Sequence, residues 1–226
     1  MKRPAKVSHI LCVATAIVVL SISIGGCKTV ADFNARHDTT IGKKRRVENV
    51  HQVAKLPGHL RRVAVLPIHR GRYDHIEMKA IEENFRQEII KRNLFEVVPV
   101  TAETMEEFFG SGSYSSIEHL PTKLLSKLHT AYAIDGVMLI DISYYNAYQP
   151  VGLGVRVKLL DGHTGEIVWA VDELFDSASP TVSNAARKYY QTRSTNQYPL
   201  QGSQTMLSSP TRFSKYVAEA IFGEIQ

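Results

Sequence analysis

The chain has 226 residues, of which 27 are lysine or arginine and 22 are aspartate or glutamate, giving a formal charge of +5. Three of the basic residues, Lys2, Arg3 and Lys6, lie at the N-terminus, and without them 24 basic residues face 22 acidic ones. So small a surplus gives no electrostatic case for nucleic acid as a partner. The roughly 200 residues that follow the N-terminal segment suit a single domain.

The N-terminus has the three parts of an export signal. A positive segment without acidic residues precedes an apolar run from Ile10 to Ile24, and two glycines and Cys27 follow that run. This order is typical of a secretory signal. The apolar run is too short and too rich in serine and threonine for a comfortable spanning helix, which needs about 20 apolar residues.

Cys27 ends a segment that resembles the lipobox of bacterial lipoproteins: an aliphatic residue, two small residues and then cysteine. Small residues let an extended backbone enter a peptidase site, and the thiol is the nucleophile that accepts a diacylglycerol. The alternatives are an ordinary secretory signal with an incidental cysteine and an uncleaved membrane anchor. The lipobox interpretation predicts a signal peptide over residues 1–26, and acyl chains such as palmitate on Cys27 that hold the protein on a membrane.

Both cysteines of the chain are then accounted for, because Cys12 lies in the predicted signal peptide and Cys27 carries lipid. The mature protein is predicted to have no disulfide and no cysteine-ligated metal. Lys28 follows the lipidated cysteine. In lipoproteins of enteric bacteria an aspartate there retains the protein in the inner membrane. By that resemblance, lysine implies the outer membrane, facing the periplasm.

Residues 27–60 are predicted to form a flexible tether, because this stretch is polar and keeps no apolar period. Its basic cluster, Lys43 to Arg46, is interpreted as a solvated segment near anionic lipid headgroups rather than a nucleic-acid site. The single domain is predicted to begin at Arg61 and to cover residues 61–226.

The domain opens with the apolar run Val63 to Ile68, which is typical of a buried strand. Asp74 and Glu77 have the spacing of a helix N-cap and capping box. Behind them, apolar residues at every fourth position predict a helix that ends near Asn93, a residue that tolerates left-handed backbone. These residues are Ile81, Phe85 and Ile89. A second strand, Leu94 to Val100, follows.

Two further helices and a long strand are predicted in the middle of the chain. The first helix covers Thr101 to Phe109, with Thr101 as a cap, and the second runs from Pro121 to about Ala133. A Gly/Ser loop, Gly110 to Ser116, separates them. The aliphatic and aromatic run Val137 to Tyr148 then predicts a central strand.

Two strands with alternating side chains form the clearest pair in the sequence. Gly154 to Leu160 and Ile167 to Val171 flank a glycine-containing turn over Asp161 to Gly165, which predicts an antiparallel hairpin. Pro180 to Tyr190 is a candidate helix, and the polar stretch Gln191 to Ser208 is interpreted as a loop.

Ser209 and Pro210 suit the N-cap and first position of a last helix with an apolar face. The predicted order is therefore β-α-β-α-α-β-β-β, a candidate helix and a terminal helix. Strands separated by helices imply crossovers, and consecutive strands imply a meander. The predicted fold class is α/β (α+β), a mixed β-sheet with packed helices.

The ordered set of these features resembles a superfamily of bacterial envelope lipoproteins. The set is the lipobox, the tether, the runs VAVLPI and LFEVVPV, and the segment LLDGHTGEIVWA, whose most specific part is Leu160 to Trp169. The superfamily includes the curli-secretion lipoproteins and the lipoprotein activators of penicillin-binding peptidoglycan synthases. The resemblance covers about Arg61 to Ile225. It implies a fold like that of the TolB N-terminal domain and a role in binding or assembly without catalysis.

The residues themselves offer no motif for chemistry. G-x-S-x-G and H-E-x-x-H are absent. His69, Asp74 and His75 could hold a metal, but Asp74 is already explained as a cap. Asp161 and His163 share a turn, where aspartate commonly bonds its own backbone. We therefore predict no catalytic, cofactor-binding or metal-ligating residue and no small-molecule substrate, and we expect that the chain is not an enzyme.

Tyrosines supply the predicted protein-binding surface. Tyr144, Tyr145 and Tyr148 lie at the end of the central strand, and Tyr189 and Tyr190 lie where the candidate helix meets the later polar stretch. Adjacent side chains on a strand point to opposite faces, so at least one of the first group is predicted to be exposed. Tyrosine is enriched in protein interfaces. The alternative is partial burial in the core, as we predict for the single tryptophan.

Two hypotheses of function follow. The first is an anchored, non-catalytic module that binds or regulates an envelope protein, with activation of a peptidoglycan synthase as one concrete form. The second is a subunit of an outer-membrane secretion or assembly complex of the curli-secretion type. A membrane barrel needs strands with a lipid-facing apolar side. The candidate insertions, Phe108 to Glu118 and Gln191 to Leu207, are polar and do not alternate, so we prefer the first hypothesis.

Overall fold

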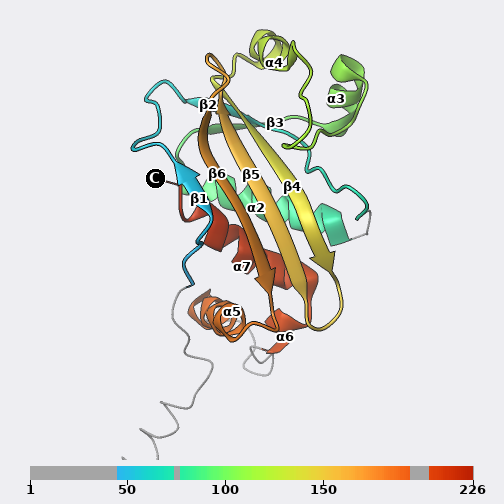
Figure 1. Ribbon diagram of the computed structural model, residues 1–226, viewed down its shortest axis with the longest axis vertical. Coiled ribbons are helices and arrows are strands. Elements are labelled where there is room, and N and C mark those ends of the chain that lie inside the picture. Colours follow the sequence, from blue (N-terminus) through green and yellow to red (C-terminus); the bar gives the residue numbers. More distant parts are fainter. Residues whose placement is uncertain (1–44, 74–76, 194–203, 226) are drawn as a thin grey trace, which may run out of the picture. The chain divides into compact units, whose positions relative to one another are not determined.

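The computed structural model of the protein describes residues 45–73, 77–193 and 204–225 (Figure 1). Its centre is a mixed six-stranded β-sheet. The strand order is β1-β6-β5-β4-β2-β3. The strands are β1 (Val50–Gln52), β2 (Arg62–Val65), β3 (Glu96–Pro99), β4 (Gly136–Asn146), β5 (Gly152–Asp161) and β6 (Ile167–Asp176). The helices are α2 (Glu77–Arg92), α3 (Ala102–Phe109), α4 (Leu124–Tyr132), α5 (Pro180–Arg193), α6 (Gln204–Leu207) and α7 (Pro210–Phe222).

The pairing of the strands confirms the predicted fold class. β2 pairs in parallel with β3 and β4, as strands separated by helices should. β4, β5 and β6 are antiparallel to one another, as a meander requires. From β2 to β6 the observed elements follow the predicted order. No helix among the described residues is long and apolar enough to cross a membrane.

The domain starts earlier than the sequence predicts. The predicted boundary at Arg61 is wrong, because β1 adds to the edge of β6 and because Val47 and Leu60 are buried in the core. A strand of three residues is too short for its side chains to show a period, and its partner lies more than a hundred residues away in the chain. The predicted signal peptide, Cys27 and residues 28–44 lie outside the described residues.

The sheet separates two apolar clusters. On one side, buried residues of α2, α5 and α7 pack against side chains such as Met138 and Ile140 of β4. On the other side, α3 and α4 pack against Val137 and Leu139 of the same strand. In Figure 1, α3 and α4 cover only the upper end of this second side, and no described helix lies in front of β4, β5 and β6 below them. We name this uncovered part the open face.

A register shift interrupts the alternation of side chains in the last hairpin. Val155, Val157 and Leu159 of β5 are buried, and so, as predicted, is Trp169 of β6. Strict alternation with Trp169 would bury Ile167 and expose Val168, but Ile167 is partly exposed and Val168 is buried. The reason is an irregularity between Leu159 and Leu160, opposite the start of β6.

Several helix ends agree with the predicted chemistry. Asn93 after α2 has a φ of 53°, Thr101 Oγ1 accepts the Thr104 N–H before α3, and Ser209 caps α7 with Pro210 in its first turn. The interpretation of Gln191 to Ser208 as a loop is partly wrong, since α5 extends to Arg193 and α6 lies within this stretch. Asp74 and the side chain of Glu77 lie outside the described residues.

Candidate functional site

The open face carries exposed apolar side chains near the end of β4. Tyr144 of β4 is 42% exposed and Leu174 of β6 is 51% exposed, and both pair with Gly154 of β5, which runs between them. Paired residues on adjacent strands lie on the same face, so the two side chains flank Gly154. Ile117, in the loop between α3 and α4, is 68% exposed. We name Tyr144, Leu174 and Ile117 the apolar patch.

Glycines of β5 make room for the Tyr144 ring. A Cβ atom on Gly152 would lie 2.6 Å from Tyr144 Cε1, and one on Gly154 would lie 2.7 Å from Ser143 Oγ. The register of β4 against β5 shifts between Ile142 and Tyr144, and such bulges redirect side chains. The Gly-Leu-Gly segment that begins β5 therefore serves close packing of an aromatic ring on a strand.

The five tyrosines predicted as a binding surface do not lie together. Tyr144 and Tyr148 are exposed, but Tyr145 is 7% exposed and its ring meets Tyr73 edge-on in the core. Its inclusion was therefore wrong, because the strand turns adjacent side chains to opposite faces. Tyr189 and Tyr190 of α5 are half-buried and pack on the cluster behind the sheet. Burial, reinforced by nearby carboxylates, raises the pKa of Tyr189.

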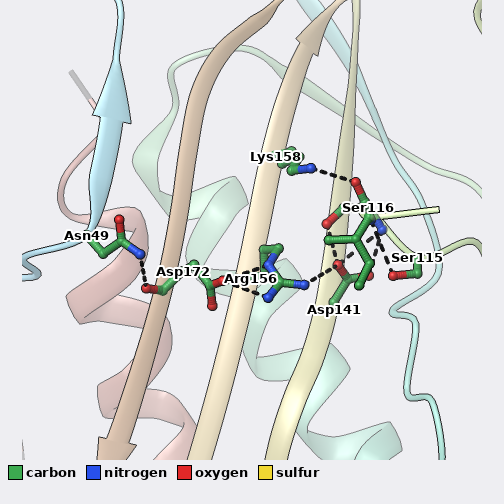
Figure 2. Close-up of polar contacts among 8 residues, drawn as sticks. Asn49, Ser115, Ser116, Asp141, Arg156, Lys158 and Asp172 are labelled. Carbon is green, nitrogen blue, oxygen red and sulfur yellow. Dashed lines mark hydrogen bonds and ion pairs between the residues drawn. The ribbon is translucent and has the colours of Figure 1, made fainter. Parts of the chain in front are cut away.

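A row of polar contacts crosses the open face (Figure 2). Arg156 of β5 donates from Nε to Asp172 Oδ2 of β6 at 2.8 Å, and its Nη1 lies 4.0 Å from Asp141 Oδ2 of β4. Asn49 Nδ2, just before β1, donates to the carbonyl oxygen of Asp172 at 3.0 Å. The row ties the three central strands to one another and to the segment that enters the sheet.

Asp141 holds the loop between α3 and α4 on the open face. The residue is 3% exposed, and its carboxylate accepts both the N–H of Ser116, at 3.0 and 3.1 Å, and the Ser116 hydroxyl. Lys158 Nζ donates to the Ser116 carbonyl at 2.6 Å. Figure 2 shows Ser116 and Asp141 meeting in front of β4. The loop is therefore fastened immediately beside the exposed Ile117.

Sequence reasoning missed Asp141, although a signal exists. It is the one charged residue in the apolar stretch from Val137 to Ile142 of the predicted central strand. A charged residue in a buried strand is retained only where it is paired or hydrogen-bonded. That rule indicates that Asp141 has a partner but does not identify it, because Ser116 lies in a loop, where the sequence has no periodic pattern that would place its side chain.

The polar row is suited to fixing structure rather than to reacting. Asp141 is engaged by Ser116, and Asp172 by Arg156, so neither carboxylate is a free base. Ser113 Oγ lies 3.4 Å from His69 Nδ1, longer than the about 2.6–3.2 Å that joins a nucleophile to its base. Over residues 45–73, 77–193 and 204–225, no group of three or more metal-ligating side chains occurs. Of the loop that was considered as a metal site and interpreted instead as a helix cap, Asp74 and His75 lie outside these ranges.

Asp161 holds the turn between β5 and β6, as predicted. Its Oδ1 accepts the N–H groups of His163 and Thr164 at 2.8 and 3.2 Å, and its Oδ2 lies 2.7 Å from His59 Nε2. Burial acts to raise the pKa of Asp161, but the hydrogen bonds outweigh it and lower the pKa below its usual value. His59 is itself outside the predicted domain, so the sequence indicated the turn but not this contact.

The lowered pKa of Asp161 predicts a pH-dependent contribution to stability. A carboxyl whose pKa is lower in the folded than in the unfolded state stabilises the fold above its unfolded pKa, and this contribution is lost as the pH falls through the folded pKa. The Asp161→Asn variant lacks this carboxyl group and therefore its pH-dependent contribution. We expect the variant to be less stable than the wild type at about pH 7, and the difference to shrink as the pH falls below the ordinary aspartate pKa of about 3.9. Urea unfolding of both proteins over this pH range measures the difference, and a difference that stays constant would contradict the assignment.

Gly154→Ala is expected to destabilise the protein by about 1–3 kcal/mol, the usual range for overpacking. Its Cβ would lie 2.7 Å from Ser143 Oγ and 2.9 Å from Tyr144 Cβ, so the bulge must move. Gly58→Ala is the matched control, because nothing lies within 4 Å of a Cβ there. Alanine at such an open position is neutral or slightly stabilising. Denaturant titration of both variants measures the difference, and equal stabilities would show that β4 and β5 are not packed this closely.

No protein-family model and no curated protein matches the chain. Solved structures do match. The lipoprotein GNA1162 from Neisseria meningitidis is 16% identical, with 51% of this chain and 79% of that chain covered and a TM-score of 0.38. The PelC dodecamer from Paraburkholderia phytofirmans is 14% identical, with 75% of this chain and 96% of that chain covered and a TM-score of 0.39. The LpoB C-terminal domain from Escherichia coli is 16% identical, with 51% of this chain and 82% of that chain covered and a TM-score of 0.34.

These matches include a lipoprotein, the kind of protein that the sequence resemblance names. At such identities and TM-scores they say nothing about activity or partners.

Proposed function

We propose that the chain is a lipid-anchored protein of the bacterial envelope that acts without catalysis, by binding a partner protein through the open face. The observation that carries the binding role is the apolar patch, in which Tyr144 and Leu174 stand exposed on either side of Gly154. The N-terminal segment ending at Cys27 supports the anchoring. The partner is an envelope protein, and a peptidoglycan synthase is one specific candidate.

The open face has the composition of a protein interface. Aromatic residues and arginine are enriched at interfaces, and an exposed apolar group rimmed by polar residues marks an interaction site. Here Tyr144, Leu174 and Ile117 are exposed beside the row that contains Arg156.

The open face is also held in place before a partner binds. Asp141 fastens the loop that bears Ile117, and the glycines of β5 seat the ring of Tyr144. A fixed surface loses less side-chain and loop entropy on binding, which favours affinity.

Photo-crosslinking in living cells tests the binding role. A photoreactive amino acid placed at position 144 or 174 should give a discrete crosslinked product with an envelope protein. Ile90 of α2 and Leu94 after it supply matched control positions, because both are exposed apolar residues outside the open face. Equal products from the control positions, or none from positions 144 and 174, would contradict the proposed face.

Mass spectrometry of the mature N-terminus tests the anchoring separately. We expect the first residue to be Cys27 carrying acyl chains. A mature protein that retains residues 1–26, or that begins elsewhere, would refute the anchor while leaving the crosslinking result to be judged by itself.

A further inference from the structure

One part of the chain carries basic residues but no acidic ones. From Ser177 to Ala218 the sequence has five lysine and arginine residues and no aspartate or glutamate. These five are Arg187, Lys188, Arg193, Arg212 and Lys215. All of them lie on α5 or α7.

The fold gathers these cations around one pair of helices. Lys188 lines a cavity of about 260 Å³ between α5 and α7, together with Tyr189 and Tyr216. Arg193, in the last turn of α5, pairs with Glu219 of α7 at 3.1 Å. Lys215 is exposed and precedes Glu219 by one helical turn, so it lies on the same side of α7.

The nearby carboxylates cancel only part of this charge. Glu219 offsets Arg193, and Glu173 of β6 offsets Arg45. Within the described part of the chain, Lys188 makes no ion pair. Lys188 and Lys215 therefore leave this surface with a net positive charge, and the Arg193 guanidinium lies 6.0 Å from the centre of the half-buried Tyr189 ring.

The chain enters the domain at the same place. Arg45, the first described residue, lines the cavity with Lys188, and its guanidinium lies 5.1 Å from the centre of the Phe175 ring. Cys27 precedes Arg45 by 18 residues, a length that spans at most about 60 Å when fully extended. An anchored chain therefore keeps this basic surface within reach of the membrane.

We infer that the surface formed by Arg45, Lys188, Arg193, Lys215 and Tyr189 binds the anionic headgroups of the membrane that holds the lipid anchor. Lysine and arginine near such a surface are attracted to anionic lipids, and tyrosine is enriched at the membrane interface. The surface lies behind the sheet, so docking leaves the open face free for a protein partner. The inference rests on the proposed anchoring, but it concerns other residues than the partner site.

Spin labelling of the lipidated full chain tests this docking. Because Cys12 is removed and Cys27 is acylated in the proposed mature protein, Thr192→Cys supplies a single free thiol on α5. We expect a label there to be shielded from a water-soluble relaxing reagent in vesicles of phosphatidylcholine with phosphatidylglycerol. In vesicles of phosphatidylcholine alone, or at high salt, it should be exposed. Thr130→Cys on α4 is the control position and should stay exposed in all cases.

Charge reversal makes the test specific. Taking about fivefold for each cation near the surface, Lys188→Glu with Lys215→Glu should shift the ratio of docked to free protein by at least about 25-fold. Lys79→Glu with Lys123→Glu changes the net charge equally at exposed positions on α2 and before α4. This control pair should have little effect. Equal effects of the two pairs, or a label at position 192 that is equally exposed in both lipid mixtures, would overturn the inference.

Failure of the anchor is distinguishable from failure of the surface. If mass spectrometry finds no lipid on Cys27, the purified Thr192→Cys chain with Cys12 and Cys27 replaced by serine can still be mixed with the same two kinds of vesicle. Shielding at position 192 that depends on phosphatidylglycerol would then support the basic surface without the anchor. No shielding in either mixture would refute the surface whatever the state of Cys27.

Discussion

Phe222→Ala is expected to lower the free energy of unfolding by about 3–5 kcal/mol, the range for removing a large aromatic side chain from a core. Phe222 is fully buried at the end of α7. Its ring meets Phe85 of α2 edge-on at 5.8 Å and lies 6.4 Å from the ring of Trp169 on β6. One side chain therefore joins two helices to the sheet, and its loss leaves a cavity that three elements must close.

Urea unfolding followed by tryptophan fluorescence measures this effect, because Trp169 is the only tryptophan and lies beside the site. Circular dichroism should give the same midpoint. Phe108→Ala on α3 makes the same chemical change at a half-buried position and should cost clearly less. If the two variants were equally destabilised, Phe222 would not be the central packing residue that the structure shows.

Cys27→Ser should abolish lipid attachment and with it stable membrane association. Each acyl methylene buried in a bilayer contributes about 0.8 kcal/mol, so several chains on one cysteine bind almost irreversibly, and a serine hydroxyl provides no thioether. We expect the acylated N-terminal peptide to disappear from mass spectra and the normally processed form to disappear from the envelope fraction.

Cys12→Ser is the matched control for this change, because it replaces the other cysteine of the chain, which lies within the predicted signal peptide. It should leave processing, acylation and fractionation unchanged. If Cys27→Ser instead yields a product with the wild-type mass and location, the lipid anchor is refuted, and the outer-membrane location and tethered domain that depend on it fall with it.

The proposed roles use opposite sides of one sheet. In Figure 1, α7 lies behind the sheet and α5 lies at its lower end, and these two helices carry the basic surface. The open face of β4, β5 and β6 lies in front with the apolar patch. A domain docked through its helices would present the patch away from the lipid. Cells that carry Lys188→Glu with Lys215→Glu should therefore retain crosslinking from position 144 if the two surfaces act independently.

Much of the structure could be predicted from the sequence alone, because it depends on interactions between neighbouring residues. Thr101, Ser209 and Asn93 act at helix ends through bonds or backbone angles that involve only neighbouring residues. Asp161 acts likewise at its turn. The mixed sheet also followed from the order of elements, because helices between strands require crossovers and a short turn requires a hairpin.

The features that only the tertiary structure decided depend on residues far apart in the chain. β1 is a strand because β6 offers it an edge, and Asp141 is satisfied because a distant loop brings Ser116 to it. Tyr144 is exposed and Tyr145 buried because helices cover only one side of β4 at that point. Periodicity predicts that two faces differ, but which face is covered depends on packing that no local pattern encodes.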